Sequence, residues 1–239
     1  IESYDTDVVG TTVVMHISDA EKEYLEASKI RSILDKYCSF MPVDIYFNDG
    51  TEQEVKEGED CKEEPVNDTF PLWQKQPSEC TEEEYNEFYH KVFGDFRDPL
   101  FYIHINADYP LNFKGILYFP KIENEYQSIE GQVKLYYNQV FVADNIKEVI
   151  PEYLLMLRGV LDCPELPLNV SRSYLQTNTY VSKLSAHIVK KVADKLNSMF
   201  NLERDSLEKN WADMKPYFEY ACMRDEKFGD KVRDVVLFE

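Results

Sequence analysis

The chain has 239 residues, is 44% hydrophobic and carries a formal net charge of −19 at pH 7. This hydrophobic content suffices for a buried core and excludes a wholly disordered chain, and the length fits one large domain or two small ones. The negative charge repels phosphate backbones and anionic lipid headgroups, so we expect no nucleic-acid partner and no membrane. It fits either an ordinary acidic cytosolic surface or one that makes weak contacts with basic or unfolded proteins.

The cysteines form no recognisable metal-binding or disulfide pattern, because no CxxC occurs and no histidine lies at ligand spacing from a cysteine. We expect reduced thiols, no metal and a cytosolic location. No apolar run approaches the roughly 18 residues that a membrane span needs. The chain begins at Ile1 within a polar stretch, which indicates a segment of a longer protein.

The first part of the chain predicts two strands and a helix. Residues 11–17 form a short β-branched run after Gly10, and residues 43–47 form a second run. Between them, Ser18 and Glu21 have the spacing of a capping box that opens an amphipathic helix to about residue 38. Residues 48–69 are acidic and lack the fixed glycine of a calcium loop, so we expect a mobile loop without metal.

The middle part predicts a helix and three strands. Thr81 and Glu84 form another capping box, which opens a helix to residue 93. Strands are expected at residues 100–105, 113–119 and 133–142. A short helix at residues 151–158 and a coil at 159–171 follow.

After Tyr180 the pattern is helical only. Apolar residues recur at helical spacing to about residue 200, and further helices are expected at residues 206–220 and 225–237. The chain is therefore expected to be α/β (α+β), with strands and helices up to about residue 180 and helices alone beyond it.

Catalytic signatures are missing from the sequence. No glycine-rich phosphate loop, GxSxG, HExxH or Rossmann fingerprint occurs. The chain has 8 glycines, which are the residues that let backbone approach phosphate closely, and its four histidines are scattered. These observations argue against a complete enzyme.

The segment at residues 159–172 is a long loop stiffened by Pro164 and Pro167, with Arg172 at its far end and Asn169 and Gln176 nearby. A guanidinium on a rigid loop suits a phosphate, because its planar fork donates two hydrogen bonds and stays charged. The alternative is a surface arginine paired with a carboxylate, which is common in an acid-rich protein.

Several motifs resemble, in the same order, the middle domain of heat shock protein 90 chaperones of the bacterial HtpG type. They are PLW (71–73), EEYNEFYHK (83–91), LYFP (117–120), VKLY (133–136), VFV (140–142), PEYL (151–154), RGVLD (158–162), LPLNVSR (166–172) and LQ (175–176). The opening GTTVVMHI is similar to the last strand of the family's amino-terminal ATPase domain. The acidic stretch is too short for the charged linker of eukaryotic members, which favours the bacterial type.

The resemblance implies a fold of three units. These are the tail of the ATPase domain at residues 1–18, a large α/β/α subdomain with a mixed sheet at 19–180, and a small all-helical subdomain at 181–239. ATP and Mg²⁺ would be bound by the missing amino-terminal domain, with none expected in this segment. The implied partners are that ATPase domain, client proteins and co-chaperones, with a homodimer for the full protein and a monomer for the segment.

The resemblance also implies roles for particular residues. Arg172 is the family's arginine that contacts the γ-phosphate when the domains dock, with Asn169 and Gln176 on the same loop. Phe141 corresponds to an aromatic residue at the docking surface. Trp73 and Phe96 occupy positions suited to exposed aromatics that bind clients.

The sequence departs from the family pattern at four positions. Ser173 replaces the usual glutamate after the arginine, Asn138 and Gln139 replace basic residues, and Phe96 replaces a tryptophan. The changes at 138, 139 and 173 remove local ion-pair support of the loop, whereas the arginine itself is kept.

Two alternatives stay open. One is a pure interaction module in which Arg172 is structural. The other is the related transducer domain of a mismatch-repair or topoisomerase protein of the GHKL class. Such proteins use a lysine for this task and handle DNA, which a charge of −19 disfavours.

Overall fold

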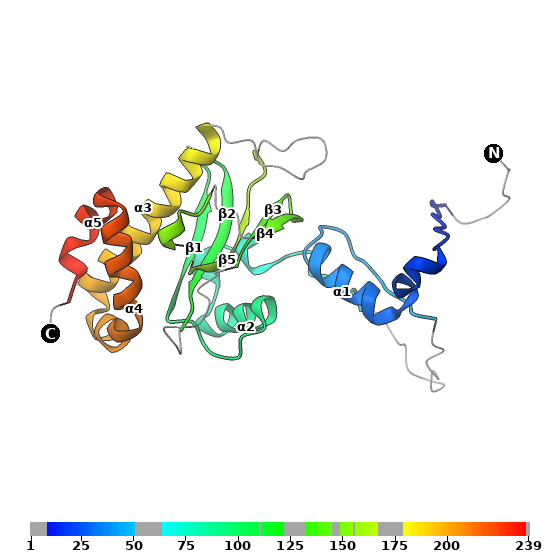
Figure 1. Ribbon diagram of the computed structural model, residues 1–239, viewed down its shortest axis with the longest axis horizontal. Helices are drawn as coiled ribbons and strands as arrows, with labels where there is room; N and C mark the ends of the chain where they lie inside the picture. The colour runs from blue at the N-terminus through cyan, green and yellow to red at the C-terminus, as the bar shows by residue number, and fades with distance from the viewer. Residues whose placement is uncertain are drawn as a thin grey trace.

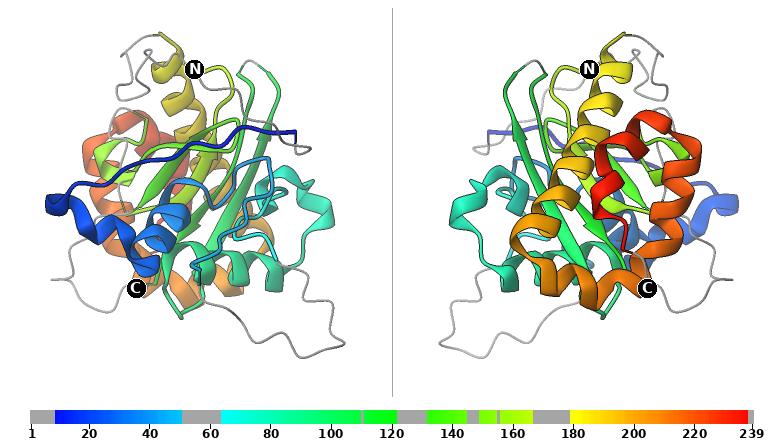
Figure 2. Two further views of the ribbon diagram at one scale, coloured as in Figure 1. Left: turned by 90° about the vertical axis from the view of Figure 1, so that its right-hand side faces the viewer. Right: turned by 90° about the vertical axis from the view of Figure 1, so that its left-hand side faces the viewer.

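The computed structural model describes residues 9–50, 64–109, 111–121, 132–144, 149–154, 156–166 and 179–237. A twisted sheet lies at the centre, α3 to α5 lie beside it at one end, and the segment that contains α1 extends away at the other (Figure 1). The two turned views show α3 (Thr179–Leu202) running along one face of the sheet (Figure 2).

The sheet has five strands in the order β1-β2-β5-β3-β4. These strands are β1 (Phe101–Ala107), β2 (Phe113–Phe119), β3 (Val133–Tyr137), β4 (Val140–Asp144) and β5 (Arg158–Asp162). The central strand β5 is antiparallel to β2 and parallel to β3, so the sheet is mixed.

Both faces of the sheet are buried. Ile116 and Tyr118 belong to one core cluster with Trp73 of the 3₁₀ turn η2 (Leu72–Gln74) and with α2 (Glu82–Phe93). Leu117 and Phe119, the alternate residues of the same strand, belong to the other cluster with α3 and the later helices. Alternate strand residues point to opposite faces, so the sheet is covered on each side by helical structure.

The central strand β5 was not expected. The sequence predicts a coil from residue 159, because the apolar pair Val160 and Leu161 is too short to show a periodicity. In the structure, Gly115 and Gly159 permit close pairing of β2 with β5. A Cβ at Gly159 would lie 2.6 Å from the backbone oxygen of Ile116, and one at Gly115 would lie 2.3 Å from that of Val160.

The strand expected at residues 133–142 is a hairpin of two strands. β3 and β4 pair antiparallel, and Asn138 (φ 48°) and Gln139 (φ 63°) form the turn between them. A two-residue hairpin turn with positive φ at both positions matches the twist of the strands, and asparagine tolerates that conformation best after glycine. These two departures from the family pattern therefore occupy a turn.

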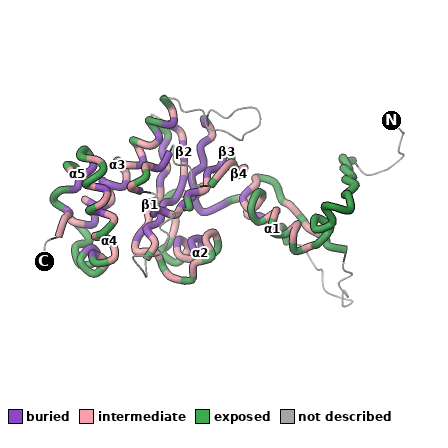
Figure 3. The backbone as a smooth tube through the Cα atoms, viewed as in Figure 1, coloured by how far each residue is buried: buried purple, intermediate pink, exposed green. Residues whose placement is uncertain are grey.

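The first part of the chain lacks both expected strands. Residues 11–18 and 41–47 have no regular structure, and among the described residues no strand lies beside them to complete a ladder. The carboxamide of Asn67 instead holds the second segment, since it accepts from the Ile45 amide and donates to the carbonyls of Met41 and Val43. This part of the chain is largely exposed (Figure 3).

The helix expected at residues 18–38 is two elements. These are the 3₁₀ helix η1 (Asp19–Leu25) and α1 (Ala27–Tyr37), separated by the extended Glu26. Ser18 makes no side-chain cap, so the capping box expected there does not form. The box of α2 is confirmed, with Thr81 accepting from the Glu84 amide and Glu84 accepting from the Thr81 amide.

The remaining helices occur where they were expected, but their ends differ by several residues in places. The helix expected at 151–158 is only the turn η4 (Glu152–Leu154), because β5 begins at residue 158. The last helices are α4 (Arg204–Arg224) and α5 (Glu226–Val232), and the turn η5 (Arg233–Val235) follows them. Another short turn, η3 (Pro77–Glu79), precedes α2.

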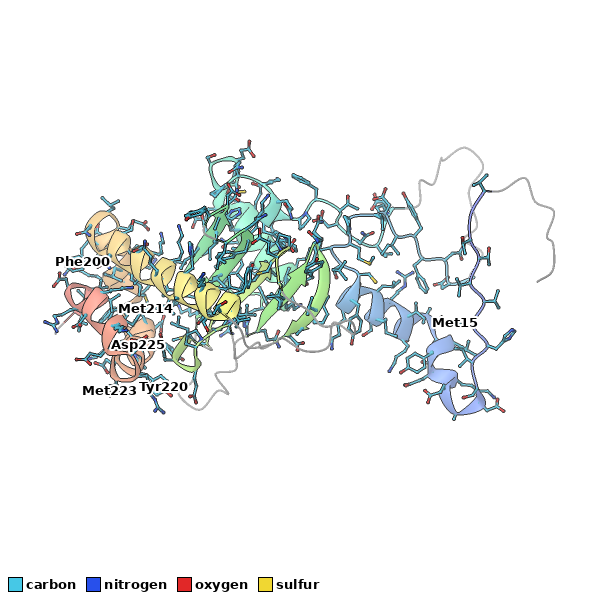
Figure 4. The ribbon with its side chains drawn as sticks, turned by 90° about the horizontal axis from the view of Figure 1, so that it is seen from above. Met15, Phe200, Met214, Tyr220, Met223 and Asp225 are labelled. Atoms are coloured by element: carbon cyan, nitrogen blue, oxygen red, sulfur yellow. The ribbon has the colours of Figure 1, made fainter. Side chains whose placement is uncertain are left out.

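Asp225 marks the junction of α4 and α5, at the opposite end of the molecule from the exposed Met15 (Figure 4). The expected α+β class is confirmed, because a mixed five-stranded sheet with helices precedes a helical carboxy-terminal segment. The division into three units, with boundaries after residues 18 and 180, stays a prediction.

Candidate functional site

The predicted phosphate-binding residues Asn169, Arg172 and Gln176 lie outside the described residues. The elements on either side are described: β5 ends at Asp162, and α3 begins at Thr179. The described surroundings of the site are therefore the end of β5 and the start of α3.

Both flanks are attached to the buried core. After β5, the Cys163 amide donates to the Tyr136 carbonyl at 3.0 Å, and the Leu166 amide donates to the Cys163 carbonyl at 3.2 Å. The side chains of Cys163 and Leu166 are buried, and so is that of Val181 in the first turn of α3. Burial among apolar groups raises the pKa of the Cys163 thiol, which makes it a structural group rather than a nucleophile.

Phe141 lies on the edge strand β4, where it is half-buried. Its ring makes edge contacts with Tyr37 of α1 and Tyr136 of β3, with centroids 5.5 and 5.8 Å apart. The Lys36 ammonium lies 6.0 Å from the Phe141 centroid. The aromatic residue predicted at the docking surface thus joins the sheet to the end of α1.

A second cation lies on β3, the neighbour of β4. The Lys134 ammonium donates to the Val92 carbonyl at 3.0 Å and stands over the Phe93 ring. Burial lowers the pKa of Lys134, and the charge of Lys36 acts in the same direction. Asp144, which lies opposite Lys134 in the β3–β4 pair, opposes this fall in the pKa and offsets the charge of Lys134.

Asp162, the last residue of β5, is a buried carboxylate that no sequence motif singles out. Its Oδ2 accepts from Trp73 Nε1 and Gln74 Nε2, both at 3.4 Å, and from the Gln139 amide at 3.1 Å. Burial raises the pKa of the Asp162 carboxyl, while the hydrogen bonds from Trp73 and the turn oppose that rise. The available signal was a single carboxylate at the end of an apolar run, in Gly159-Val-Leu-Asp162.

The aromatic residues expected to bind clients have opposite surroundings. Trp73 is fully buried, which corrects the expectation of an exposed side chain. Its ring packs against Phe40, Phe88 and Tyr136, and its Nε1 donates to Asp162, so both the apolar ring and its polar atom have partners in the core. Phe96 is 93% exposed.

The segment that carries Phe96 is held firmly. Asp95 accepts from the Arg97 Nε at 2.9 Å and from Arg158 Nη1 at 2.8 Å, and Gly94 takes the left-handed conformation that ends α2. The two arginines lower the pKa of the Asp95 carboxyl to about 2. Phe96 therefore projects into solvent from a fixed backbone.

No group of three or more His, Cys, Asp or Glu in the described part of the chain could hold a metal ion. None of the helices there is long and apolar enough to cross a bilayer.

The fold and the site together indicate a class of protein: an α+β scaffold that presents aromatic side chains and continues into a helical unit. The family described as Hsp90 protein matches residues 51–239, so the chain belongs to the Hsp90 family.

Curated relatives agree with this assignment. The chain is 45% identical over 232 residues to a chaperone protein htpG of Bacteroides fragilis, covering 96% of this chain and 34% of the relative. It is 44% identical to a chaperone protein HtpG of Porphyromonas gingivalis, covering 100% of this chain and 35% of the relative. For the HtpG of Geobacter sulfurreducens the identity is 34%, covering 100% and 39%. The chain thus spans about a third of the length of these relatives.

Proposed function

We propose that this chain is the middle segment of an ATP-dependent molecular chaperone, and that Arg172 contacts the γ-phosphate of ATP bound by a preceding domain. The observation that carries the proposal is the match to the Hsp90 family across residues 51–239, which includes the arginine motif. Leu166 and Val181, the described core residues on either side of this motif, are buried, so the segments that lead into and out of it start from the core.

The role of Arg172 in this proposal is electrostatic. Transfer of the γ-phosphoryl group spreads negative charge over its oxygens, and a guanidinium delivered in cis stabilises that charge. Asn169 and Gln176 would add hydrogen bonds from the same loop, and Phe141 would fix the docked position. ATP hydrolysis and domain closure are then coupled, because the arginine arrives only when the domains meet.

The remaining assignments belong to the same proposal. Mg²⁺ would accompany ATP in the preceding domain. The full protein would be a cytoplasmic homodimer that acts on client proteins with co-chaperones, and the isolated segment would be a monomer without ATPase activity.

The test is Arg172→Ala in the full-length protein, with ATP turnover and nucleotide affinity measured separately. We expect kcat to fall by up to about 10³-fold while the Kd for ATP changes by less than about twofold. Arg204→Ala is the matched control, since Arg204 is exposed in the helical unit and paired with Glu208. An equal loss of affinity would make Arg172 a general binding residue. Unchanged turnover would favour the pure interaction module.

A client-binding surface at Phe96 is a second function, favoured by its 93% exposure and by the Asp95 carboxylate, which accepts from the backbone amide of Arg97. A fixed, exposed aromatic ring contacts a partner with little loss of conformational entropy. Phe96→Ser should weaken binding of an unfolded client by about tenfold, whereas Tyr109→Ser, at another exposed aromatic residue, should not. Equal effects of both variants would refute a specific role for Phe96.

A further inference from the structure

The Asp162 carboxylate occupies an unusual position. It is 4% exposed, and it ends the central strand β5. A buried carboxylate is costly unless hydrogen bonds offset its lost hydration. Here its Oδ2 accepts from three donors, whereas its Oδ1 has no hydrogen-bond partner among the residues that the structure describes.

The three donors come from two separate parts of the chain. Trp73 and Gln74 belong to η2, which packs against one face of the sheet. The third donor is the backbone amide of Gln139, in the positive-φ turn between β3 and β4. The carboxylate therefore joins η2, the turn and the end of β5 at one point.

The side chain of Gln139 extends the same connection. Its Nε2 donates to the carbonyls of Phe40 and Thr69, each at 3.0 Å. The turn is thus held from its backbone by Asp162 and from its side chain by two segments that precede η2. Phe141 follows two residues after Gln139, so its position depends on how this turn is held.

Resting on the function proposed above, we propose that Asp162 is a positioning residue for ATP hydrolysis. Its carboxylate holds the β3–β4 turn on the end of β5, so that the docking residue Phe141 keeps a fixed place relative to the strand that leads towards Arg172. Asp162 touches no substrate in this proposal and acts through the turn.

An isosteric pair of variants separates acceptor chemistry from packing. Asp162→Asn keeps an oxygen that can accept from the turn, whereas Asp162→Leu has a similar volume and no acceptor. In the full-length protein we expect the asparagine variant to retain kcat within about twofold. The leucine variant should lose about tenfold in kcat, with KM for ATP within about twofold of wild type. Equal kcat values for the two variants would overturn the proposal.

Two further measurements keep the test valid if Asp162→Leu folds poorly. Gln139→Met removes the side-chain Nε2 donor to the carbonyls of Phe40 and Thr69 and leaves the Asp162 carboxylate and the backbone amide of residue 139 in place. Because the turn then loses its side-chain attachment, we expect kcat to fall about threefold with an unchanged circular dichroism spectrum. Asp144→Asn, at the exposed end of β4, is the control that should leave kcat unchanged. Wild-type kcat in the Gln139 variant would count against the proposal.

A double-mutant cycle tests whether Asp162 acts through the docking surface. In a Phe141→Ala background, Asp162→Leu should lower kcat by less than about twofold further, because the residue that it positions is already missing. Fully additive losses would indicate a general structural role and overturn the proposal. If Arg172→Ala and Phe141→Ala both leave kcat unchanged, the proposed function fails and this inference with it. If both lower kcat while the Asp162 pair does not differ, this inference alone fails.

Discussion

Replacing Asp95 by asparagine should destabilise the chain by an amount that depends on pH. Asp95 accepts from the Arg97 amide at 3.2 Å, from Arg97 Nε at 2.9 Å, from Arg158 Nη1 at 2.8 Å and from the Tyr89 hydroxyl at 3.3 Å. Its side chain is 10% exposed, so solvent screens these contacts only weakly. Asparagine keeps the shape but removes the charge.

The magnitude follows from the pKa of Asp95, which falls from 3.8 to about 2 on folding. Each unit of pKa shift corresponds to about 1.4 kcal/mol, so the ionised carboxylate contributes about 2 kcal/mol at pH 7. The folded pKa is lowered, so between the two pKa values the unfolded state binds more protons than the folded state. The contribution is therefore complete above about pH 5 and is lost as the pH falls towards 2.

Urea unfolding of wild type and Asp95→Asn at pH 7 and pH 3 measures this contribution. We expect a difference of about 2 kcal/mol in the free energy of unfolding at pH 7, smaller by about 1 kcal/mol at pH 3. Asp98→Asn is the control, because Asp98 is largely exposed and pairs only with His90 among the described residues. A difference that is the same at both pH values would refute the electrostatic explanation.

Three further changes test the fold itself. Thr81→Ala removes the cap of α2 and should lower the free energy of unfolding by about 1 kcal/mol in urea titrations. Gly159→Ala places a Cβ 2.6 Å from the Ile116 carbonyl oxygen in the central pair of strands, and should cost at least about 2 kcal/mol, seen as a lower Tm. Tyr153→Phe removes the 2.6 Å hydrogen bond to Asp225 and should cost about 1 kcal/mol, whereas an unchanged Tm would mean that this bond adds nothing to the contact between η4 and α5.

The local elements with strong sequence signals agree with the structure. The capping box at Thr81 opens α2 because side-chain caps depend on a few neighbouring residues, and α3 follows its apolar spacing. The motif order also assigns the chain to its family. Boundaries were less accurate where a neighbouring element took over residues, as β5 does from the helix expected to extend to residue 158.

The sequence by itself determined the α+β class, the capped helix α2 and the position of Arg172 in its motif. Tertiary structure alone decided that residues 158–162 form the central strand, that Trp73 is buried while Phe96 is exposed, and that Asp162 joins η2 to the β3–β4 turn. The physical reason is the separation along the chain between the residues that interact. Caps and helical periods arise between residues three or four apart, whereas strand pairing and carboxylate burial depend on partners far away in the chain, such as Trp73 for Asp162.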